Sequence, residues 1–162
     1  MVYTMKFYTD GGCRRNGRPG AVGAAAAVQQ RRWGKIKTWR KSLPAYPRPT
    51  NQRAEITGII LALIQALKRH QELYGRPSFR VTIYTDSKYA IGCMNEWIYK
   101  WVENGWINAA GNEVANRDLI EMAFDLHETL ADLGKVRYRW IPREENQLAD
   151  ELCNDDMDEQ ES

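Results

Sequence analysis

The stretch YTMKFYTDGGCRRNGRPGAVGAAAAV, residues 3–28, decides the fold because it holds two predicted strands joined by a turn. Residues 3–9 are rich in aromatic and β-branched side chains, which favours a strand. Residues 11–20 have the glycine and proline content of a turn, and residues 21–28 are small and apolar, as in a central strand. Residues 36–42 alternate in polarity and predict a third strand. Together the three strands predict an antiparallel meander.

The rest of the chain alternates predicted helices and strands. Asn51 follows a proline-rich connector at an expected helix N-cap position, and apolar side chains at helical spacing predict a helix over residues 52–70. The remaining pattern predicts strands at 80–84 and 136–141, helical segments at 87–102 and 116–133, and a short helix from Gln147 that ends in a frayed acidic tail. This order predicts an α/β fold with a five-stranded mixed sheet, three strands antiparallel and two parallel, and helices on both faces.

Composition narrows the class of protein. The chain has 162 residues, of which 43% are hydrophobic and 27% charged, as expected for a globular domain. No apolar run reaches the roughly 20 residues that span a membrane, and the N-terminus does not resemble a signal peptide. The three cysteines are widely spaced and form no CxxC motif, which argues against a disulfide framework and a zinc site. We therefore expect an intracellular protein, in the cytoplasm or, in a eukaryote, the nucleus.

Charge is unevenly distributed along the chain. The net charge is +2, from 23 basic and 21 acidic residues. Nine of the acids lie from Glu144 onward, where there is no Lys or Arg, so the first 143 residues carry 23 basic residues against 12 acids, or +11. A basic body suits a polyanionic partner, although a solvated basic surface is an equally good interpretation of charge alone.

Four carboxylates are candidates for chemistry. Asp10 and Asp86 each end a predicted strand, at the edge where α/β sheets bind ligands. Glu55 lies in the first turn of the first long helix, and Asp150 in the last helix. If the four converge they repel one another, and divalent ions that prefer oxygen ligands, Mg²⁺ first and Mn²⁺ second, would offset that repulsion. Taken singly, each acid is more simply a turn, cap or helix-dipole residue.

Four motifs that contain these acids resemble type 1 ribonuclease H. They are YTDGGCRRNGRPGAVGAA (8–25), TNQRAEITGIILAL (50–63), YTDSKYAIGCMNEWIYKW (84–101) and ENQLADEL (145–152), in family order, and the resemblance covers residues 3–154. It implies the ribonuclease H-like fold, and an endonuclease that hydrolyses the RNA strand of RNA–DNA hybrids. It also implies that Asp10, Glu55, Asp86 and Asp150 hold two metal ions, and that the products carry a 5′-phosphate and a 3′-hydroxyl.

The resemblance also implies substrate contacts. Asn16, Asn51 and Gln52 match residues that touch RNA 2′-hydroxyls or bases in the minor groove, where an amide can both donate and accept. A second set, Arg48, Thr50 and Asn116, matches a pocket for a DNA phosphate, and Trp97, Trp101 and Trp106 match the aromatic face of the family's substrate handle. Loop solvation, a helix cap and ordinary helix packing are the competing interpretations, and at least one tryptophan is expected to be mainly core.

The chain departs from the family in two places. The loop WIPREENQLAD, residues 140–150, lacks the histidine that assists proton transfer, so we expect slower turnover and hypothesise that Glu144 or Glu145 substitutes for it. Neither His70 nor His127 matches. The handle is poor in lysine, which predicts weaker hybrid binding; a basic group elsewhere could compensate. That group is Arg31, Arg32, Lys35, Lys37, Arg40 and Lys41.

These observations lead to one preferred interpretation and two rivals. We expect a monomer with a ribonuclease H catalytic domain over residues 1–154, an acidic C-terminal tail over residues 155–162, and an RNA–DNA hybrid as partner, with no membrane association. The main rival is a nucleic-acid-binding module that kept the fold with weak or no catalysis. A resolvase-like nuclease of the same superfold is disfavoured by Asn16, Asn51 and Gln52, because they match contacts to the 2′-hydroxyl.

Overall fold

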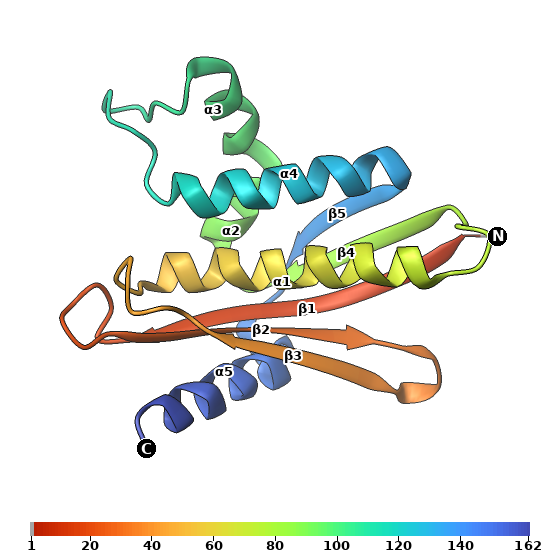
Figure 1. Cartoon of the computed structure of the whole chain (residues 1–162), viewed down its shortest axis with the longest axis horizontal. Coiled ribbons are helices and arrows are strands. Elements are labelled where there is room, and N and C mark those ends of the chain that lie inside the picture. Colours follow the sequence, from red (N-terminus) through yellow and green to blue (C-terminus); the bar gives the residue numbers. More distant parts are fainter. Residues whose placement is uncertain (1) are drawn as a thin grey trace.

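A single five-stranded mixed sheet organises the computed structural model, which describes residues 2–162 (Figure 1). The strand order is β3-β2-β1-β4-β5, with β1–β2 and β2–β3 antiparallel and β1–β4 and β4–β5 parallel. The strands are β1 Tyr3–Arg14, β2 Val22–Gln30, β3 Ile36–Ser42, β4 Phe79–Thr85 and β5 Lys135–Trp140. The predicted five-stranded mixed sheet, with three antiparallel strands and two parallel ones, is therefore confirmed.

Helices cover both faces of this sheet, as predicted. On one face α1 packs on β1 and β2 and is flanked by α4, whereas α5 packs on β1, β2 and β3 from the other face (Figure 1). The helices are α1 Asn51–Glu72, α2 Lys88–Gly92, α3 Ile98–Asn104, α4 Arg117–Leu133 and α5 Gln147–Gln160. A π-helical turn, Cys93–Trp97, joins α2 to α3. No helix in residues 2–162 is long and apolar enough to cross a membrane.

The main core lies between the sheet and α1. Alternate β1 residues, such as Met5 and Phe7, are fully buried, and they meet Ile56, Ile59 and Leu63 of α1. This alternation follows from the pleat, which sends successive side chains to opposite faces. The opposite β1 face therefore carries Lys6, Tyr8 and Asp10.

Two predicted boundaries need correction near the start of the fold. Asp10 does not end the first strand, because β1 continues to Arg14 and residues 11–14 pair with β2 instead of forming a turn. Asn51 is not the N-cap of α1. Thr50 takes that role, since its side chain accepts a hydrogen bond from the Arg53 backbone N–H at 3.1 Å.

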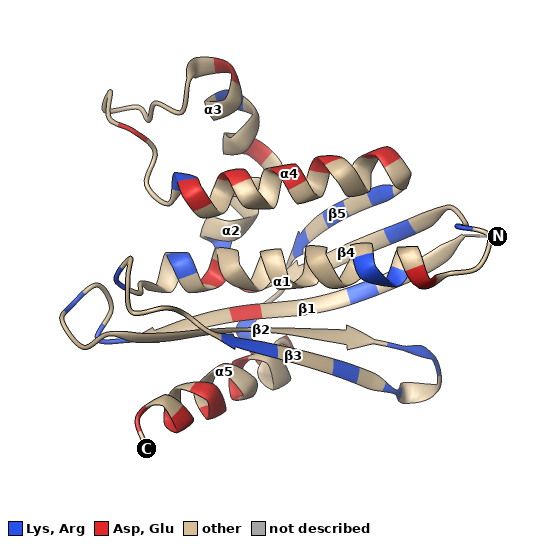
Figure 2. Ribbon diagram, viewed as in Figure 1, with Lys and Arg blue, Asp and Glu red and all other residues tan. Residues whose placement is uncertain are grey.

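The predicted frayed tail after residue 154 is also wrong. Helix α5 continues to Gln160, with Asp156 and Met157 buried. Asp156 accepts a hydrogen bond from Ser42 Oγ at 2.7 Å, and Gln160 Nε2 donates to the Gly23 carbonyl at 2.9 Å. Acidic composition predicted a solvated tail, but α5 packs on β1–β3 along its length, and two of its acids, Asp158 and Glu159, pair with arginines. Figure 2 shows the acidic residues of α5 in red.

Candidate active site and nucleic-acid interface

Two of the four candidate acids are brought together by parallel pairing of β1 and β4. Thr9 lies in register with Thr85, so Asp10 and Asp86 occupy the next position on each chain. Pairing with β4 stops there, while β1 continues along β2. Asp10 is 8% exposed, so its carboxyl has a restricted water contact.

Glu55 reaches this point because α1 lies very close to β1. A Cβ added to Gly11 would sit 2.1 Å from the Ala54 carbonyl carbon, and one added to Gly58 would sit 2.8 Å from the Asp10 carbonyl oxygen. Only glycine allows such close backbone approach. Glu55 then accepts a hydrogen bond at 2.5 Å from the Oγ of Ser87, the residue that follows Asp86 in the chain.

Asp150 is held near the same strand edge by Asn146, the residue just before α5. The Asn146 amide donates to the Thr9 carbonyl at 2.8 Å and to Asp86 Oδ1 at 3.4 Å, and its side chain is buried. Its Oδ1 is buried without a hydrogen-bond partner among the described residues. The sequence interpretation missed Asn146, because its position in ENQLADEL fits an ordinary helix start and its partners lie on distant strands.

Burial and mutual repulsion raise the pKa values of two of the acids. Burial, reinforced by the charges of Asp86 and Asp150, raises the pKa of Asp10 to about 8, against a smaller lowering by the Gly11 backbone N–H. Burial also raises the pKa of Glu55, with the Ser87 hydrogen bond opposing the shift and Asp86 adding to it. Such shifts arise where carboxylates lie together with too little positive charge.

The four acids do not form a ready-made metal cage. Within residues 2–162, no three Asp, Glu, His or Cys side chains lie close enough to hold one ion together. The donor chemistry nevertheless suits hard divalent cations, since all four groups are carboxylates, and the buried Asn146 Oδ1 is a further oxygen without a partner. A basic side chain also pairs with one of the acids: Arg143 Nη2 lies 3.7 Å from Asp150 Oδ1, and the Arg143 side chain is largely exposed.

The proposed substitutes for the loop histidine lie beside this site. Glu144 and Glu145 are exposed in a short 3₁₀ turn directly before Asn146. Glu145 is near enough to Tyr8 to contribute to raising its pKa, after burial and Tyr84. Both histidines are engaged elsewhere: His70 is buried against Phe79, and His127 Nδ1 is 2.8 Å from the Tyr138 hydroxyl.

The N-terminus of α1 gathers the residues expected to read the RNA strand. Asn16 Oδ1 accepts from the Asn51 backbone N–H at 2.9 Å, which ties the loop after β1 to α1. Arg48 Nη1 donates to the Gly17 carbonyl at 3.4 Å. Arg48, one of the expected DNA-phosphate contacts, therefore lies beside the loop that carries Asn16. Thr50, between them, uses its hydroxyl to cap the helix.

Asn116 joins this cluster from the start of α4. Its Nδ2 donates to Gln52 Oε1 at 3.3 Å and to the Tyr89 hydroxyl at 3.0 Å, while its Oδ1 accepts from Arg53 Nη1 at 3.5 Å. Its backbone is left-handed, with φ 63°, and its side chain does not cap α4. Asn116 therefore occupies the N-cap position of α4, as the competing interpretation expected, but its side chain makes no capping hydrogen bond and contacts Gln52, Tyr89 and Arg53 instead.

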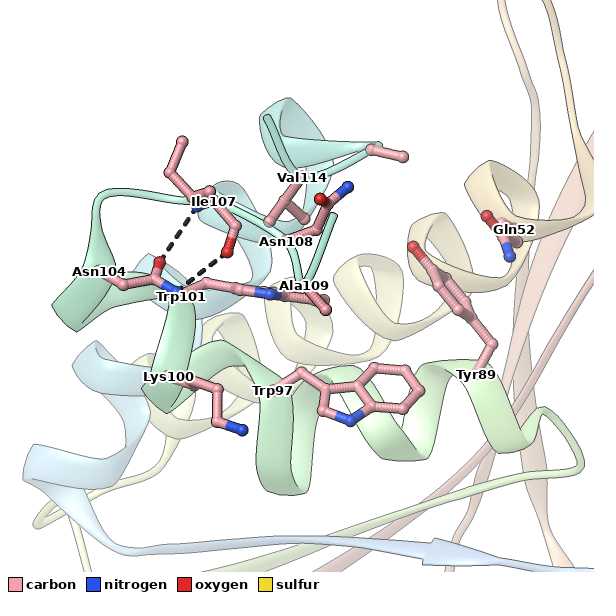
Figure 3. A pocket seen from close by; sticks show the side chains of 11 residues that line it. Gln52, Tyr89, Trp97, Lys100, Trp101, Asn104, Ile107, Asn108, Ala109 and Val114 are labelled. Atoms are coloured by element: carbon pink, nitrogen blue, oxygen red, sulfur yellow. Dashed lines mark hydrogen bonds between the residues drawn. The ribbon is translucent and has the colours of Figure 1, made fainter. Parts of the chain in front are cut away.

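The tryptophans form one aromatic wall with unequal exposure. Trp97 and Trp101 have ring centroids 6.0 Å apart, and Trp101 and Trp106 6.2 Å. Trp97 is 39% exposed whereas Trp106 is 8% exposed, which confirms that one of them is mainly core. A groove of about 580 Å³ runs past Trp97 and Trp101 to Tyr89 and Gln52 (Figure 3).

Comparisons with known proteins agree with this geometry. The RNase H family model matches residues 3–158. A ribonuclease H of Dechloromonas aromatica (strain RCB) is 34% identical, over 96% of this chain and 95% of its own. LC9-RNase H1, a type 1 RNase H with the type 2 active-site motif, is 26% identical with a TM-score of 0.72, over 94% of this chain and 71% of its own.

The fold is shared more widely than the sequence. LC11-RNase H1, solved in complex with an RNA/DNA hybrid, has a TM-score of 0.69 at 21% identity, over 98% of this chain and 99% of its own. That likeness shows the fold alone. From the match over residues 3–158 and the similarity to type 1 relatives, the chain belongs to the RNase H family and is a type 1 ribonuclease H.

Proposed function

We propose that this enzyme is an endonuclease that hydrolyses the RNA strand of RNA–DNA hybrids with two divalent metal ions, leaving a 5′-phosphate and a 3′-hydroxyl. One observation carries the proposal: the pairing of β1 with β4 sets Asp10 beside Asp86, and burial together with the charges of Asp86 and Asp150 raises the pKa of Asp10 to about 8. Buried acids that perturb one another strongly are typical of functional sites.

Asp10, Glu55, Asp86 and Asp150 are the residues that would hold the ions, Mg²⁺ by preference and Mn²⁺ as the alternative. Bound ions would supply a water that is deprotonated near neutral pH and positive charge beside the leaving oxygen. The protein contributes the fixed backbone that holds the acids: Gly11 and Gly58 let α1 approach β1, and Asn146 ties α5 to both strands.

We assign recognition of the hybrid to the cluster at the start of α1. Asn16, Asn51 and Gln52 carry amides that can both donate to and accept from a 2′-hydroxyl, which distinguishes RNA from DNA. Arg48, Thr50 and Asn116 would hold a phosphate of the DNA strand, since a guanidinium and short polar donors match phosphate oxygens. Trp97 and Trp101 supply the apolar wall for the sugars of that strand, in a groove that begins at Gln52.

Glu144 and Glu145 are proposed to assist proton transfer in place of the missing histidine. Both side chains are exposed and precede Asn146, which contacts Asp86. Glu144→Gln and Glu145→Gln are measured as separate variants. The variant that removes the acting residue should have a turnover number lowered about 10²-fold or more. Turnover equal to the parent in both variants would remove this part of the proposal.

The central test is cleavage of a labelled RNA–DNA hybrid in Mg²⁺ and in Mn²⁺. Asp10→Asn should abolish cutting while circular dichroism shows an unchanged fold, and duplex DNA and duplex RNA should stay intact. Extension of the RNA fragments by a polymerase without phosphatase treatment checks for the 3′-hydroxyl. If the hybrid is bound but never cut, the alternative of a weakly active or inactive binding module holds instead; the missing loop histidine and the lysine-poor handle favour that alternative, and the four carboxylates disfavour it.

Two further expectations stay predictions. A monomer is expected, and sedimentation of the purified protein checks it. An intracellular location is expected as well, and the bacterial relative adds no support to a nuclear one.

A further inference from the structure

Part of the sheet face opposite α1 carries exposed side chains beyond the reach of α5. Helix α5 packs on β1, β2 and β3, near Asp10, which is in register with Ala26 on β2. Further toward the start of β1, and across β4 and β5, this face carries mainly long polar side chains that remain exposed.

Strand register places five basic residues on this open face. Residues in register point to the same side of a sheet, and neighbours along a strand point to opposite sides. The rows that run across β1, β4 and β5 are Thr4–Arg80–Lys135, Lys6–Thr82–Arg137 and Tyr8–Tyr84–Arg139. The intervening residues Phe7, Ile83 and Tyr138 are buried toward the helices. We call Lys6, Arg80, Lys135, Arg137 and Arg139 the basic sheet face; all five are exposed. Figure 2 shows basic positions in blue on β1, β4 and β5.

The charge of this face is not neutralised within the described chain. None of the five forms an ion pair with an Asp or Glu of residues 2–162, and the three rows contain no acid. Basic residues on an edge strand such as β5 also discourage pairing between sheets. That role does not account for Lys6 and Arg80, which lie on the inner strands β1 and β4.

The basic sheet face is continuous with the candidate active site. Tyr8 precedes Asp10 by two residues on the same side of β1, about 7 Å along the strand. A depression of about 240 Å³ is lined by Tyr8, Gln30 and Asn146, the residue that contacts Asp86. Gln30 also lines a larger hollow of about 890 Å³, which extends over Lys6 to the β2–β3 hairpin.

The tip of the β2–β3 hairpin carries a tryptophan, Trp33, whose position is not explained by packing in the fold. Lys35 N–H donates to the Arg32 carbonyl at 3.3 Å, and Trp33 and Gly34 have φ values of 65° and 71°. This is a type I′ turn, whose first central position favours Asn, Asp or Gly. A tryptophan is strained in that conformation, and Trp33 is 92% exposed, so packing does not offset the strain. Arg31, Arg32 and Lys35 are its basic neighbours in the chain.

We propose that the basic sheet face and the Trp33 hairpin together bind a single-stranded nucleic acid that extends from the hybrid in the active site. Lysine and arginine side chains would contact the phosphates, and Trp33 would stack on an unpaired base. A duplex keeps its bases stacked inside, so a lone exposed indole favours an unpaired strand. The inference rests on the proposed function for the origin of the strand, but its binding step can be measured without cleavage.

The charge component is tested with Arg80→Gln/Arg137→Gln. The matched control, Lys68→Gln/Arg76→Gln, removes the same charge from exposed positions outside the three rows: Lys68 lies on α1, and Arg76 lies in the loop between α1 and β4. Fluorescence anisotropy of a labelled oligothymidine is measured over a salt series in EDTA. Loss of two phosphate contacts should lower the slope of log affinity against log salt by about 1.4, with the control unchanged. Equal slopes in both variants would overturn the proposal.

The stacking component is tested with Trp33→Asn. Asparagine suits the turn, so the melting temperature should stay equal or rise, while affinity for the oligothymidine falls about five- to a hundredfold. Unchanged affinity sinks the assignment of Trp33. An equal loss for a blunt duplex would overturn the preference for single strands, and binding of phosphatidylserine vesicles without oligothymidine binding would assign the face to a lipid surface.

A cleavage comparison separates this proposal from the nuclease proposal. A hybrid with a single-stranded overhang should be cut at lower concentration than a blunt hybrid by the parent, and this advantage should vanish in Arg80→Gln/Arg137→Gln. If no hybrid is cut at all but the oligothymidine results hold, the nuclease proposal fails and the binding face stands. If the blunt hybrid is cut but the oligothymidine measurements do not show the expected changes, the binding face is ruled out and the nuclease proposal stands.

Discussion

At the scale of single residues, Asp10 carries an unfavourable charge in the folded protein. Burial and the nearby Asp86 and Asp150 raise the pKa of Asp10 from its usual value near 4 to about 8. In the unfolded chain this carboxyl ionises above about pH 4. Between these values the folded state binds more protons than the unfolded state, so the free energy of unfolding falls as pH rises.

This linkage gives a testable prediction for the metal-free protein. Between pH 5 and pH 8 the parent should lose roughly 1–4 kcal/mol of stability relative to Asp10→Asn, which has no carboxyl to ionise. Urea unfolding in EDTA at several pH values measures the difference. Mg²⁺ should shrink it, because a bound cation favours the ionised acid. Parallel pH profiles for the two proteins would mean that Asp10 ionises normally in the fold.

The sequence identified the residues of the candidate site better than it predicted the contacts between them. Asp10, Glu55, Asp86 and Asp150 stood out because each lies in a motif of recognisable composition. Asn146 did not, because its value depends on the Thr9 carbonyl and the Asp86 carboxyl, which are 137 and 60 residues away. Contacts at such separations come from tertiary packing and leave no local pattern.

At the scale of elements, the seating of α1 on β1 sets the position of Glu55. Gly11→Ala should cost roughly 2–5 kcal/mol, because the added Cβ would lie 2.1 Å from the Ala54 carbonyl carbon, where backbone must move. Gly12→Ala is the matched control. Its Cβ would meet only the flexible Met157 Cε at 3.2 Å, and its cost should stay near 1 kcal/mol or less. Chemical denaturation and hybrid cleavage should both rank the variants in this order; similar stabilities would contradict close packing at Gly11.

The C-terminal half of α5 makes a second prediction at this scale. Removal of residues 155–162 should destabilise the fold by several kcal/mol, since it removes buried Met157 and the hydrogen bonds of Asp156 and Gln160 to β2 and β3. Removal of only residues 161 and 162 is the control and should have little effect. Thermal unfolding of the two truncations measures this. A stable protein lacking residues 155–162 would restore the frayed-tail interpretation.

The types of the elements could be predicted where hydrophobic periodicity is strong. Their first and last residues were predicted wrongly where glycines or acidic residues take part in tertiary packing. The β3 bounds, 36–42, agree with the alternating pattern. Gly11 and Gly12 suggested a turn, yet they continue β1, because α1 and α5 need close access to its backbone. The helical segment predicted at 87–102 is interrupted by a π-helical turn at Cys93–Trp97, and neither sequence pattern nor propensity marks such a turn.

At the scale of the whole molecule, charge is segregated between α5 and the rest of the chain. The acids of α5 pair with basic residues of the sheet: Arg14 Nη2 lies 2.9 Å from Asp158 Oδ1, and Arg40 Nη2 lies 2.6 Å from Glu159 Oε1 (Figure 2). These pairs are largely exposed, so each contributes only about 0–1 kcal/mol to stability. We expect these pairs to matter more for binding, because a paired arginine is less available to a polyanionic ligand.

Neutralising these acids should therefore change binding more than stability. Asp158→Asn/Glu159→Gln/Glu161→Gln raises the net charge from +2 to +5, removes the acidic partners of Arg14, and leaves Arg40 only its 4.0 Å contact with Asp156. In an Asp10→Asn background without metal, hybrid affinity at low salt should rise, with a steeper dependence on salt. The control Asp125→Asn/Glu128→Gln/Asp132→Asn makes the same charge change on α4 and should produce only the smaller long-range gain. Equal gains in both triple variants would show that net charge alone governs binding and that the arginine pairs on α5 have no local effect.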